Sequence, residues 1–586
     1  MPLDTPAEFK SGLQARPTGA APKGVPLALF LVSMSMIVAV WYWLASPVLL
    51  EHALINPAKK LDCVSYAPFR SGQTPWNSDI VISPEQIAED LSQLAVVSNC
   101  IRTYSVENGL DKVPQLASKV GLKVILGIWL GRDRVKNAAL IDTAVSLAKG
   151  YPGTVMSVVT GSEVLLRGEM TVEDLREILR SVRARIATPI TYADSWDYWM
   201  RHKEMAADVD FVTVHMLPFW EDEPIRAEDA AAHVIDIYKK VALAFPGKEI
   251  LIGEAGWPSK GRMREVSLPS RINQGRFISE LIDRAGREKI RVNVFEAYDE
   301  PWKRQWEGTV GAHWGLFDGV TRQIKHAVGS AVSNYPYWKL QLGGGLAFGA
   351  LIFLVAWLTR RSATTGLAPW LAVSACATTG GVLIGLAAEK ASYENYGVAG
   401  MFNQGMLLTV AMVLPLLCAN ALITGRPLPS FRELLGPRDG WPQSFLALVL
   451  GFVLLVTAVV TVEIALGLVF DPRSRDFPFA SLTMAAVPVC MVALLNRRSS
   501  DAGAMAEAVF AGLLAAAALF LLVNEGIHNW QSLWTTAAFT VFGAALWMPR
   551  AVAVSRVLSG MPSLPQPNPP TGAGGFVAAP NVEREK

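Results

Sequence analysis

Long apolar runs, which are typical of membrane-spanning helices, occur in two parts of the chain. The part between them contains both apolar and polar residues. An apolar run without a charged residue extends from Val25 to Leu50, and seven more apolar runs follow after residue 340. A helix that crosses a hydrocarbon core of about 30 Å needs about 20 apolar residues, whereas the apolar core of a cleaved signal peptide has only about 7–15. We therefore expect an uncleaved transmembrane anchor at 25–50 and a seven-helix membrane domain at 341–549. The seven later runs are 341–358, 366–388, 401–425, 444–470, 482–495, 504–523 and 532–549.

Residues 62–322 show a different pattern, in which short β-branched runs alternate with helical segments. Ser83 followed by Pro84 is a typical helix start. Strands that alternate with helices indicate a parallel sheet with crossover helices, and eight such units predict a (β/α)8 TIM barrel. The expected fold is therefore an α/β barrel followed by an α-helical polytopic membrane domain. The eight expected strands are 63–67, 100–104, 123–129, 154–160, 189–193, 210–216, 249–254 and 291–298.

The positions of Lys and Arg predict the orientation in the membrane. Cytoplasmic loops carry an excess of these residues, and here they precede the first span and recur at every second loop, with Arg473 and Arg475 as the exception. We expect a cytoplasmic segment at 1–24, a cytoplasmic disordered tail at 550–586 and the barrel in the periplasm, with the chain as a multi-pass inner (cell) membrane protein. The residues that set this bias are Lys10, Arg16, Lys23, Arg360, Arg361, Arg426, Arg432, Arg438, Arg497, Arg498, Arg550 and Arg556.

Composition removes several classes of function. Of the 586 residues, 51% are hydrophobic and 18% charged, and 53 Lys and Arg against 51 Asp and Glu leave no basic block for a nucleic acid. The five cysteines lack Cys/His ligand spacing, so we expect no metal and no cofactor. Cys63 and Cys100 fall on neighbouring predicted strands. Since neighbouring parallel strands seldom offer disulfide geometry, two buried thiols are favoured over a disulfide.

Two glutamates follow expected strand ends and predict glycoside chemistry. Glu163 lies in VVTGSEV after the fourth strand, and Glu254 lies in LIGEAGWP at the end of the seventh. Barrel active sites lie at the C-terminal ends of the strands. Retaining glycosidases need one carboxyl group as acid and base and another as nucleophile, about 5–5.5 Å apart. The alternative is that each is an ordinary carboxylate of the rim.

At these residues the chain resembles glycoside hydrolase family 17, the β-1,3-glucanases and glucanosyltransferases whose nucleophile motif ends in GWP. The segments SYAPF, IRTYS, FEAYDEPWK and WGLF are similar to the family's first, second and eighth strands and the stretch that follows. The resemblance covers residues 62–319, and the membrane-bound layout resembles that of bacterial members associated with β-1,6 linkages in cyclic β-1,3/1,6-glucans. It implies Glu254 as the nucleophile, Glu163 as the acid/base, and a substrate-binding set of Tyr66, Arg102, Tyr104, Ser162, His215, Trp220, Trp257, Glu300, Lys303 and Glu307.

Some members of this set depart from the family or allow a second interpretation. Ser162 stands where the family has asparagine. His215 contacts either a sugar or Glu254, or is a packed histidine of the barrel. Flat indole rings can stack on glucose units, and Trp257 and Trp220 are the first candidates for this. The other tryptophans near strand ends are Trp129, Trp196, Trp199, Trp302 and Trp306.

Three functions remain open at this point. A covalent sugar on Glu254 can pass to a sugar hydroxyl or to water, and retention at the membrane favours transfer over a tethered endo-β-1,3-glucanase. A glucan-binding or export scaffold is the third candidate, with Glu463, paired with Asn420, as an intramembrane carboxylate. A sugar-nucleotide transferase is disfavoured, because the outer domain shows no phosphate-binding glycine loop. The expected partners are β-1,3-glucan, membrane lipid and a glucan synthase in the same membrane.

Overall fold

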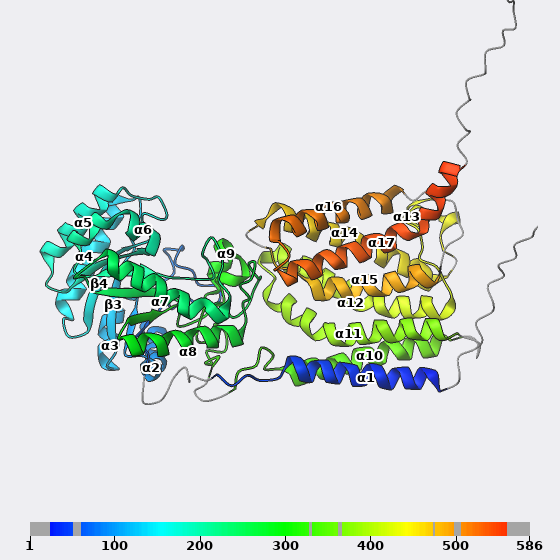
Figure 1. Ribbon diagram of the computed structural model, residues 1–586, viewed down its shortest axis with the longest axis horizontal. Helices are drawn as coiled ribbons and strands as arrows, with labels where there is room; N and C mark the ends of the chain where they lie inside the picture. The colour runs from blue at the N-terminus through cyan, green and yellow to red at the C-terminus, as the bar shows by residue number, and fades with distance from the viewer. Residues whose placement is uncertain are drawn as a thin grey trace, which may run out of the picture.

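The computed structural model describes residues 24–50, 60–326, 331–360, 366–442, 444–472, 475–496 and 505–559. The barrel lies at one end of a bundle of long helices, and the chain enters it from α1 (Val25–Leu44) and leaves it into α10 (Trp338–Thr359) (Figure 1). The two connections are tied together, because Val48 and Val332 form an antiparallel bridge. Expectations for residues 1–23 and 560–586 fall outside the described residues.

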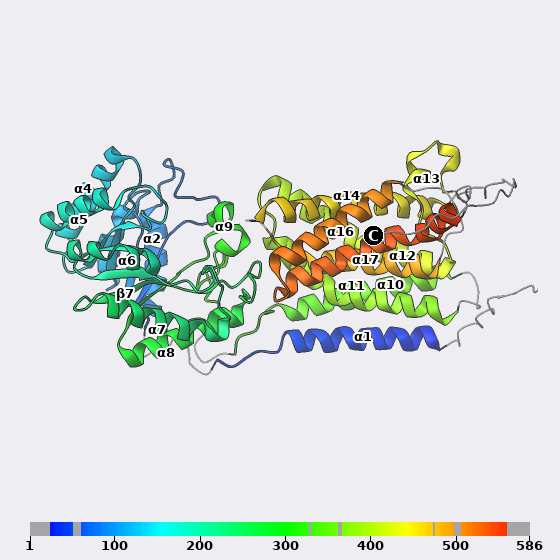
Figure 2. The ribbon, with the colours of Figure 1, turned by 45° about the horizontal axis from the view of Figure 1, so that its top comes forward.

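The eight expected strands form one closed parallel barrel in sequence order, which confirms the TIM barrel. Each strand is followed by at least one helix, and α2, α4, α5, α7 and α8 lie on the outside of the barrel (Figures 1 and 2). The strands are β1 (Cys63–Ser65), β2 (Cys100–Arg102), β3 (Lys123–Ile128), β4 (Val155–Ser162), β5 (Ile190–Ser195), β6 (Val212–His215), β7 (Ile250–Ala255) and β8 (Arg291–Val294). The helices are α2 (Pro84–Val97), α3 (Val113–Lys119), α4 (Arg134–Gly150), α5 (Val172–Arg185), α6 (Trp196–Arg201), α7 (Ala227–Ala244), α8 (Arg271–Glu288) and α9 (Arg304–Gly311).

Local sequence explains how these helices begin. The Ser83 side chain accepts a hydrogen bond from the backbone of Gln86 at the start of α2, and Thr171 and Ser270 cap α5 and α8 in the same way. The amphipathic helices then bury one face on the barrel, as with Leu175 and Leu179 of α5.

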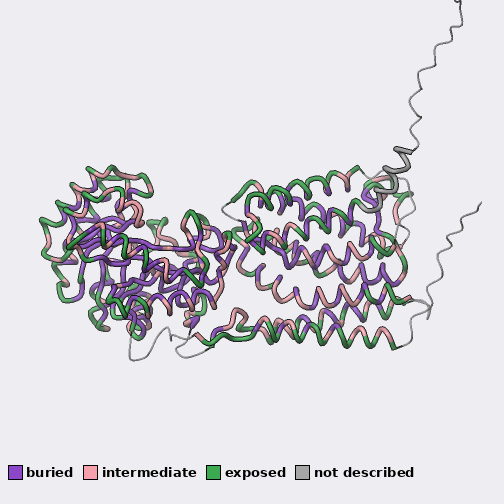
Figure 3. The backbone as a smooth tube through the Cα atoms, in the orientation of Figure 1, coloured by how far each residue is buried: buried purple, intermediate pink, exposed green. Residues whose placement is uncertain are grey.

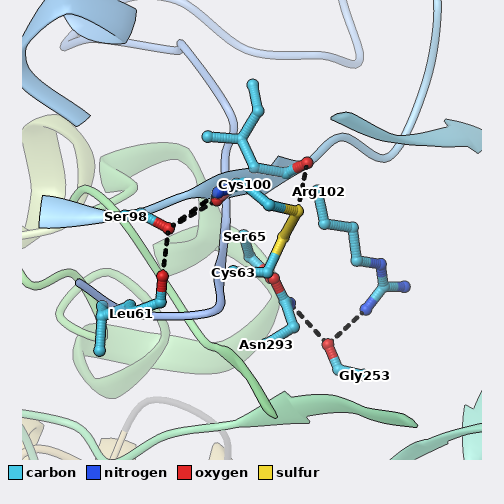
Figure 4. Close-up of a disulfide and its surroundings, with 9 residues drawn as sticks. Leu61, Cys63, Ser65, Ser98, Cys100, Arg102, Gly253 and Asn293 are labelled. Atoms are coloured by element: carbon cyan, nitrogen blue, oxygen red, sulfur yellow. Dashed lines mark hydrogen bonds between the residues drawn. A yellow bond between two sulfur atoms is a disulfide. The ribbon is translucent and has the colours of Figure 1, made fainter. Parts of the chain in front are cut away.

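A disulfide joins Cys63 of β1 to Cys100 of β2 (Figure 4), so the expectation of two free thiols is wrong. The strand register pairs Val64 with Ile101, which places the two cysteines side by side with Cα atoms 4.3 Å apart. Both belong to a small buried cluster that includes Ile125. Neighbouring parallel strands can thus be bridged when the register puts both side chains on one face.

The helical domain contains α10, α11 (Leu367–Tyr393), α12 (Gly397–Thr424), α13 (Phe431–Leu435), α14 (Phe445–Phe470), α15 (Phe479–Leu495), α16 (Met505–Glu525) and α17 (Trp530–Ser559). Within the described residues, six helices are long and apolar enough to cross a membrane, namely α1, α10, α11, α12, α14 and α16. Helix α15 is apolar but has only 17 residues. The count of eight spans stays a prediction.

Exposed apolar side chains cover the outside of the bundle, as expected for a surface in contact with lipid. Leu27 and Leu31 of α1 are 62% and 56% exposed, and α1 lies along the edge of the bundle (Figure 3). On the outside of the domain, Asn403 donates to Glu463 over 2.7 Å. The partner of Glu463 is therefore Asn403 and not Asn420.

Candidate active site

Glu163 and Glu254 stand at the C-terminal ends of β4 and β7, on the face of the barrel where active sites lie. The chain turns sharply after β4, because Gly161 (φ 88°) and Glu163 (φ 55°) both adopt left-handed backbone conformations. Such a conformation costs free energy for a non-glycine residue and is concentrated at functional sites. Here a hydrogen bond of 2.7 Å from the Glu163 amide to the Ala193 carbonyl holds the turn.

His215, the last residue of β6, lies between the two glutamates. Its Nδ1 atom is 2.7 Å from Oε1 of Glu163, and its Nε2 atom is 3.4 Å from Oε1 of Glu254. One oxygen of each carboxylate and one nitrogen of His215 lie within 4.8 Å of one another. This spacing matches the short separation of two carboxylates that act on the same glycosidic bond. His215 lies next to Glu254, as one of its interpretations expected, whereas its contact with Glu163 was not expected from the sequence.

Arg102 and Tyr104 hold Glu254 in place. The buried guanidinium of Arg102 donates to Glu254 Oε1 (3.0 Å) and to the Gly253 carbonyl (2.8 Å; Figure 4), and its other nitrogen donates to Ser162 Oγ (3.1 Å). The hydroxyl of Tyr104 donates to Glu254 Oε1 over 2.8 Å. These donors fix the orientation of the Glu254 carboxylate at the mouth of the barrel.

The charge of Glu163 is set by opposing effects. Burial disfavours the carboxylate, but the hydrogen bond and charge of His215, together with Arg167 and Arg102, outweigh it and lower the pKa of Glu163. Arg167 also stacks over Trp129, 4.2 Å from the ring centre. Because the sequence offered no motif at Arg167, this neighbour of the acid/base candidate was not predicted.

The segment after β8 adds a buried group of three carboxylates and one lysine. Lys303 donates to Glu296 over 2.5 Å, and burial, opposed by Lys303, raises the pKa of Glu296 to about 7. Burial also raises the pKa of Glu300, with the charge of Glu296 adding to it. Burial and the charges of Glu163 and Glu254 raise the pKa of Glu307, and the charge of Lys303 only partly offsets this effect. Glu296 was not among the predicted residues, although it belongs to the FEAYDEPWK segment.

Two residues of the predicted substrate-binding set are instead part of the packed wall of the barrel. The hydroxyl of Tyr66 donates to Asp90 of α2 over 3.2 Å. Trp257 has no exposed surface, packs on Phe219 and Phe277, and thus offers no open face to a sugar, which corrects its predicted stacking role. Its indole nitrogen donates to the Leu268 carbonyl over 3.1 Å, which also holds the ring in the core.

Exposed aromatic rings lie elsewhere on the rim. Trp76, in the loop after β1, is 56% exposed and lies about 6 Å, centre to centre, from Trp129, Trp302 and Trp306. Trp220 is half-buried and stacks on Trp314. The loop around Trp76 has no periodic pattern, so Trp76 could not be selected from the sequence.

Glu163, His215 and Glu254 are also close enough to share a cation. The guanidinium of Arg102 already lies 3.0 Å from Glu254 and 3.1 Å from His215 Nε2. A fixed positive charge at this point repels a metal ion, so the donor set fits a protein-held carboxylate pair better than a metal centre.

A parallel eight-stranded barrel with two carboxylates at the C-terminal ends of its strands is an arrangement that retaining glycoside hydrolases use. The model of the BtgE/BtgC glycoside hydrolase domain matches residues 63–315. This part of the chain is thus similar to a glycoside hydrolase domain.

Similar proteins come from fungi. A glucan 1,3-beta-glucosidase of Saccharomyces cerevisiae is 25% identical over 288 residues, covering 45% of this chain and 91% of the relative. A probable family 17 glucosidase of the same yeast is 27% identical over 253 residues, covering 42% of this chain and 63% of the relative. The crystal structure of a family 17 β-1,3-glucanosyltransferase from Rhizomucor miehei is 22% identical, with a TM-score of 0.41, and covers 46% of this chain and 98% of that protein. These matches leave the helical domain without a counterpart.

Proposed function

We propose that this protein is a membrane-anchored retaining glucanosyltransferase that acts on β-1,3-glucan in the periplasm and forms or branches linkages, including β-1,6 linkages. The observation that carries the proposal is the close approach of the Glu163 and Glu254 carboxylates, within 4.8 Å, at the mouth of a barrel attached to apolar helices. The names of the yeast relatives support β-1,3-glucan as the substrate.

The residues of the site divide the chemistry between them. Glu254, held in place by Arg102 and Tyr104, attacks the anomeric carbon while Glu163 protonates the leaving oxygen. The resulting glycosyl ester on Glu254 is then resolved by an acceptor hydroxyl, from which Glu163 removes the proton. The lowered pKa of Glu163 keeps its carboxylate unprotonated in the free protein, so a base is available for this second step.

The proposed location follows from the chain direction and the distribution of basic residues. α1 begins, and α17 ends, at the end of the bundle away from the barrel (Figure 1), and Arg360 and Arg426 follow helices that run toward that end. Both termini then lie in the cytoplasm. A reporter fused after Lys586 should be active in the cytoplasm; activity outside it would overturn this orientation.

Product analysis tests the activity. The full chain in lipid nanodiscs is incubated with a β-1,3-linked oligosaccharide labelled at its reducing end, and products are identified by mass spectrometry and linkage NMR. Longer or branched products are expected, and Glu254→Gln should form none. Glu249→Gln is the matched control, since Glu249 precedes β7 at its other end and pairs with Arg291 over 2.7 Å on the surface.

The same experiment distinguishes the other functions. Exclusively shorter products would make the protein a tethered endo-β-1,3-glucanase. Binding of the oligosaccharide without any product would favour a glucan-binding or export scaffold. A glucan synthase in the same membrane is the proposed supplier of the glucan, and co-purification from crosslinked membranes tests that partner.

A further inference from the structure

The rim of the barrel that carries the catalytic candidates is in contact with the helical domain. The contacts come from the loop after β7, which follows the nucleophile candidate Glu254, and from α9, which carries Glu307. On the helical domain, they involve the C-terminal ends of α11 and α16, the start of α17 and the loop between α14 and α15. Figures 1 and 2 both place α9 at the junction of the two domains.

The loop after β7 is held by hydrogen bonds between its backbone and side chains of the helical domain. The Met263 amide donates to Gln531 Oε1 over 2.8 Å, and the Met263 carbonyl accepts from Asn529 Nδ2 over 3.1 Å. Asn529 donates in turn to Glu525 (2.9 Å), which also pairs with Arg475 (2.6 Å). These buried side chains belong to the helical domain, so the loop depends on that domain for its position.

Helix α9 is held at two points on either side of Glu307. The guanidinium of Arg304 donates to the carbonyl of Tyr393, the last residue of α11. The hydroxyl of Thr309 donates to Asp476 Oδ2 over 2.6 Å. Between them the helix is bent at Gly308 (φ 70°), a conformation that glycine adopts without steric cost.

The other end of the same segment reaches the catalytic site. Lys303, directly before α9, bonds Glu296 at the end of β8. Glu307, one turn later, is half-buried and packs on Gly311, where a Cβ would come within 2.8 Å of its carboxylate. The charges of Glu163 and Glu254 act on it directly. The position of α9 therefore sets the position of a carboxylate beside the catalytic pair.

We propose that Asp476 of the helical domain is a positioning residue, which acts through Thr309 to hold α9 and Glu307 against the catalytic pair. The helical domain is then a structural part of the active site as well as an anchor. Asp476 lies outside residues 63–315, the part of the chain that the glycoside hydrolase domain model matches. This inference rests on the proposed glucan activity.

The test uses the full chain in nanodiscs with the labelled oligosaccharide. Asp476→Asn and Thr309→Val should each lower kcat about tenfold, the loss expected for a hydrogen bond to a charged group, and change KM less than twofold. Thr309→Ser keeps the hydroxyl and should retain activity. The double variant should be no slower than the slower single variant, because both remove the same contact.

Asn403→Ala is the matched control, because it removes the Asn403–Glu463 hydrogen bond of the same domain without touching the barrel. Unchanged kcat in Asp476→Asn, or losses that multiply in the double variant, would overturn the inference. If the wild type makes no product, the proposed activity fails separately. Hydrogen exchange then decides the positioning role, since residues 304–311 should exchange faster in Asp476→Asn than in Asn403→Ala, and equal rates would contradict it.

Discussion

Nδ1 of His215 lies 2.7 Å from Oε1 of Glu163, and this contact connects the acid/base candidate to the rest of the site. The opposite ring nitrogen faces Glu254 and Arg102. A single imidazole thus contacts both carboxylates, and its removal should change the proton affinity of Glu163.

Replacement of His215 should move the pH profile. Burial raises and His215 lowers the pKa of Glu163, with a net lowering. In His215→Phe the lowering contact is gone, so the pKa of Glu163 rises and the acid stays protonated to higher pH. The alkaline limb of the kcat/KM profile should shift upward, with an overall loss of about tenfold or more. His202→Phe, at a surface histidine near Glu204, is the control. An unshifted limb would remove His215 from the proton chemistry.

Replacing each of the two glutamates should reduce activity in a different way. Without the nucleophile, Glu254→Gln should be inactive on every glucoside. Glu163→Gln should lose about 10²–10⁴-fold on oligosaccharides, the usual contribution of a general acid. It should recover bond cleavage on an aryl glucoside, whose leaving group needs no proton. Release of the aryl alcohol measures this difference, and equal losses on both substrates would contradict the roles assigned to the two residues.

Trp76 should contribute to substrate binding. Its exposed indole adjoins Trp129 and Trp306 on the rim, and stacking on a sugar ring is worth about 1 kcal/mol. Trp76→Ala should therefore raise KM for long β-1,3-oligosaccharides about fivefold, with a smaller change for a disaccharide. A KM that rises equally for both lengths would place Trp76 outside an extended cleft.

Asp299 should stabilise the loop that follows β8. Burial opposes its charge, but Lys325, 2.6 Å away, and His313 outweigh burial and hold its pKa at about 2. Because this value lies below that of an unfolded chain, about 3.9, the stabilisation is present above pH 4 and is lost as the pH falls toward 2. Asp299→Asn leaves Lys325 buried without its partner and should cost about 3 kcal/mol of unfolding free energy. Thermal denaturation at pH 7 measures it, with the exposed Asp142→Asn as a near-neutral control.

The Cys63–Cys100 disulfide should stabilise the barrel. It closes a loop with a sequence separation of 37, for which chain entropy predicts about 2–4 kcal/mol. The double Cys63→Ala and Cys100→Ala variant should unfold at lower denaturant concentration by this amount. In the wild type denatured without reductant, alkylation should modify three cysteines, and modification of all five would refute the bond.

The sequence by itself determined the parts of this protein that depend on local pattern. Alternating β-branched and helical runs predicted the barrel, because each strand and helix buries its own face. Glu163 and Glu254 were identified because the active sites of such barrels are built at the C-terminal ends of the strands. Apolar length and basic loops likewise indicated the membrane spans.

Tertiary structure decided every relationship between segments far apart in the chain. The register of β1 and β2 made Cys63 and Cys100 partners, and the folding of three strand ends placed His215 between the glutamates. Packing on Phe219 and Phe277 buried Trp257, while an aperiodic loop brought Trp76 to the rim. The docking of α9 on the helical domain joined Thr309 to Asp476, although 167 residues separate them. Such contacts depend on side-chain direction and register in three dimensions, which no local pattern encodes.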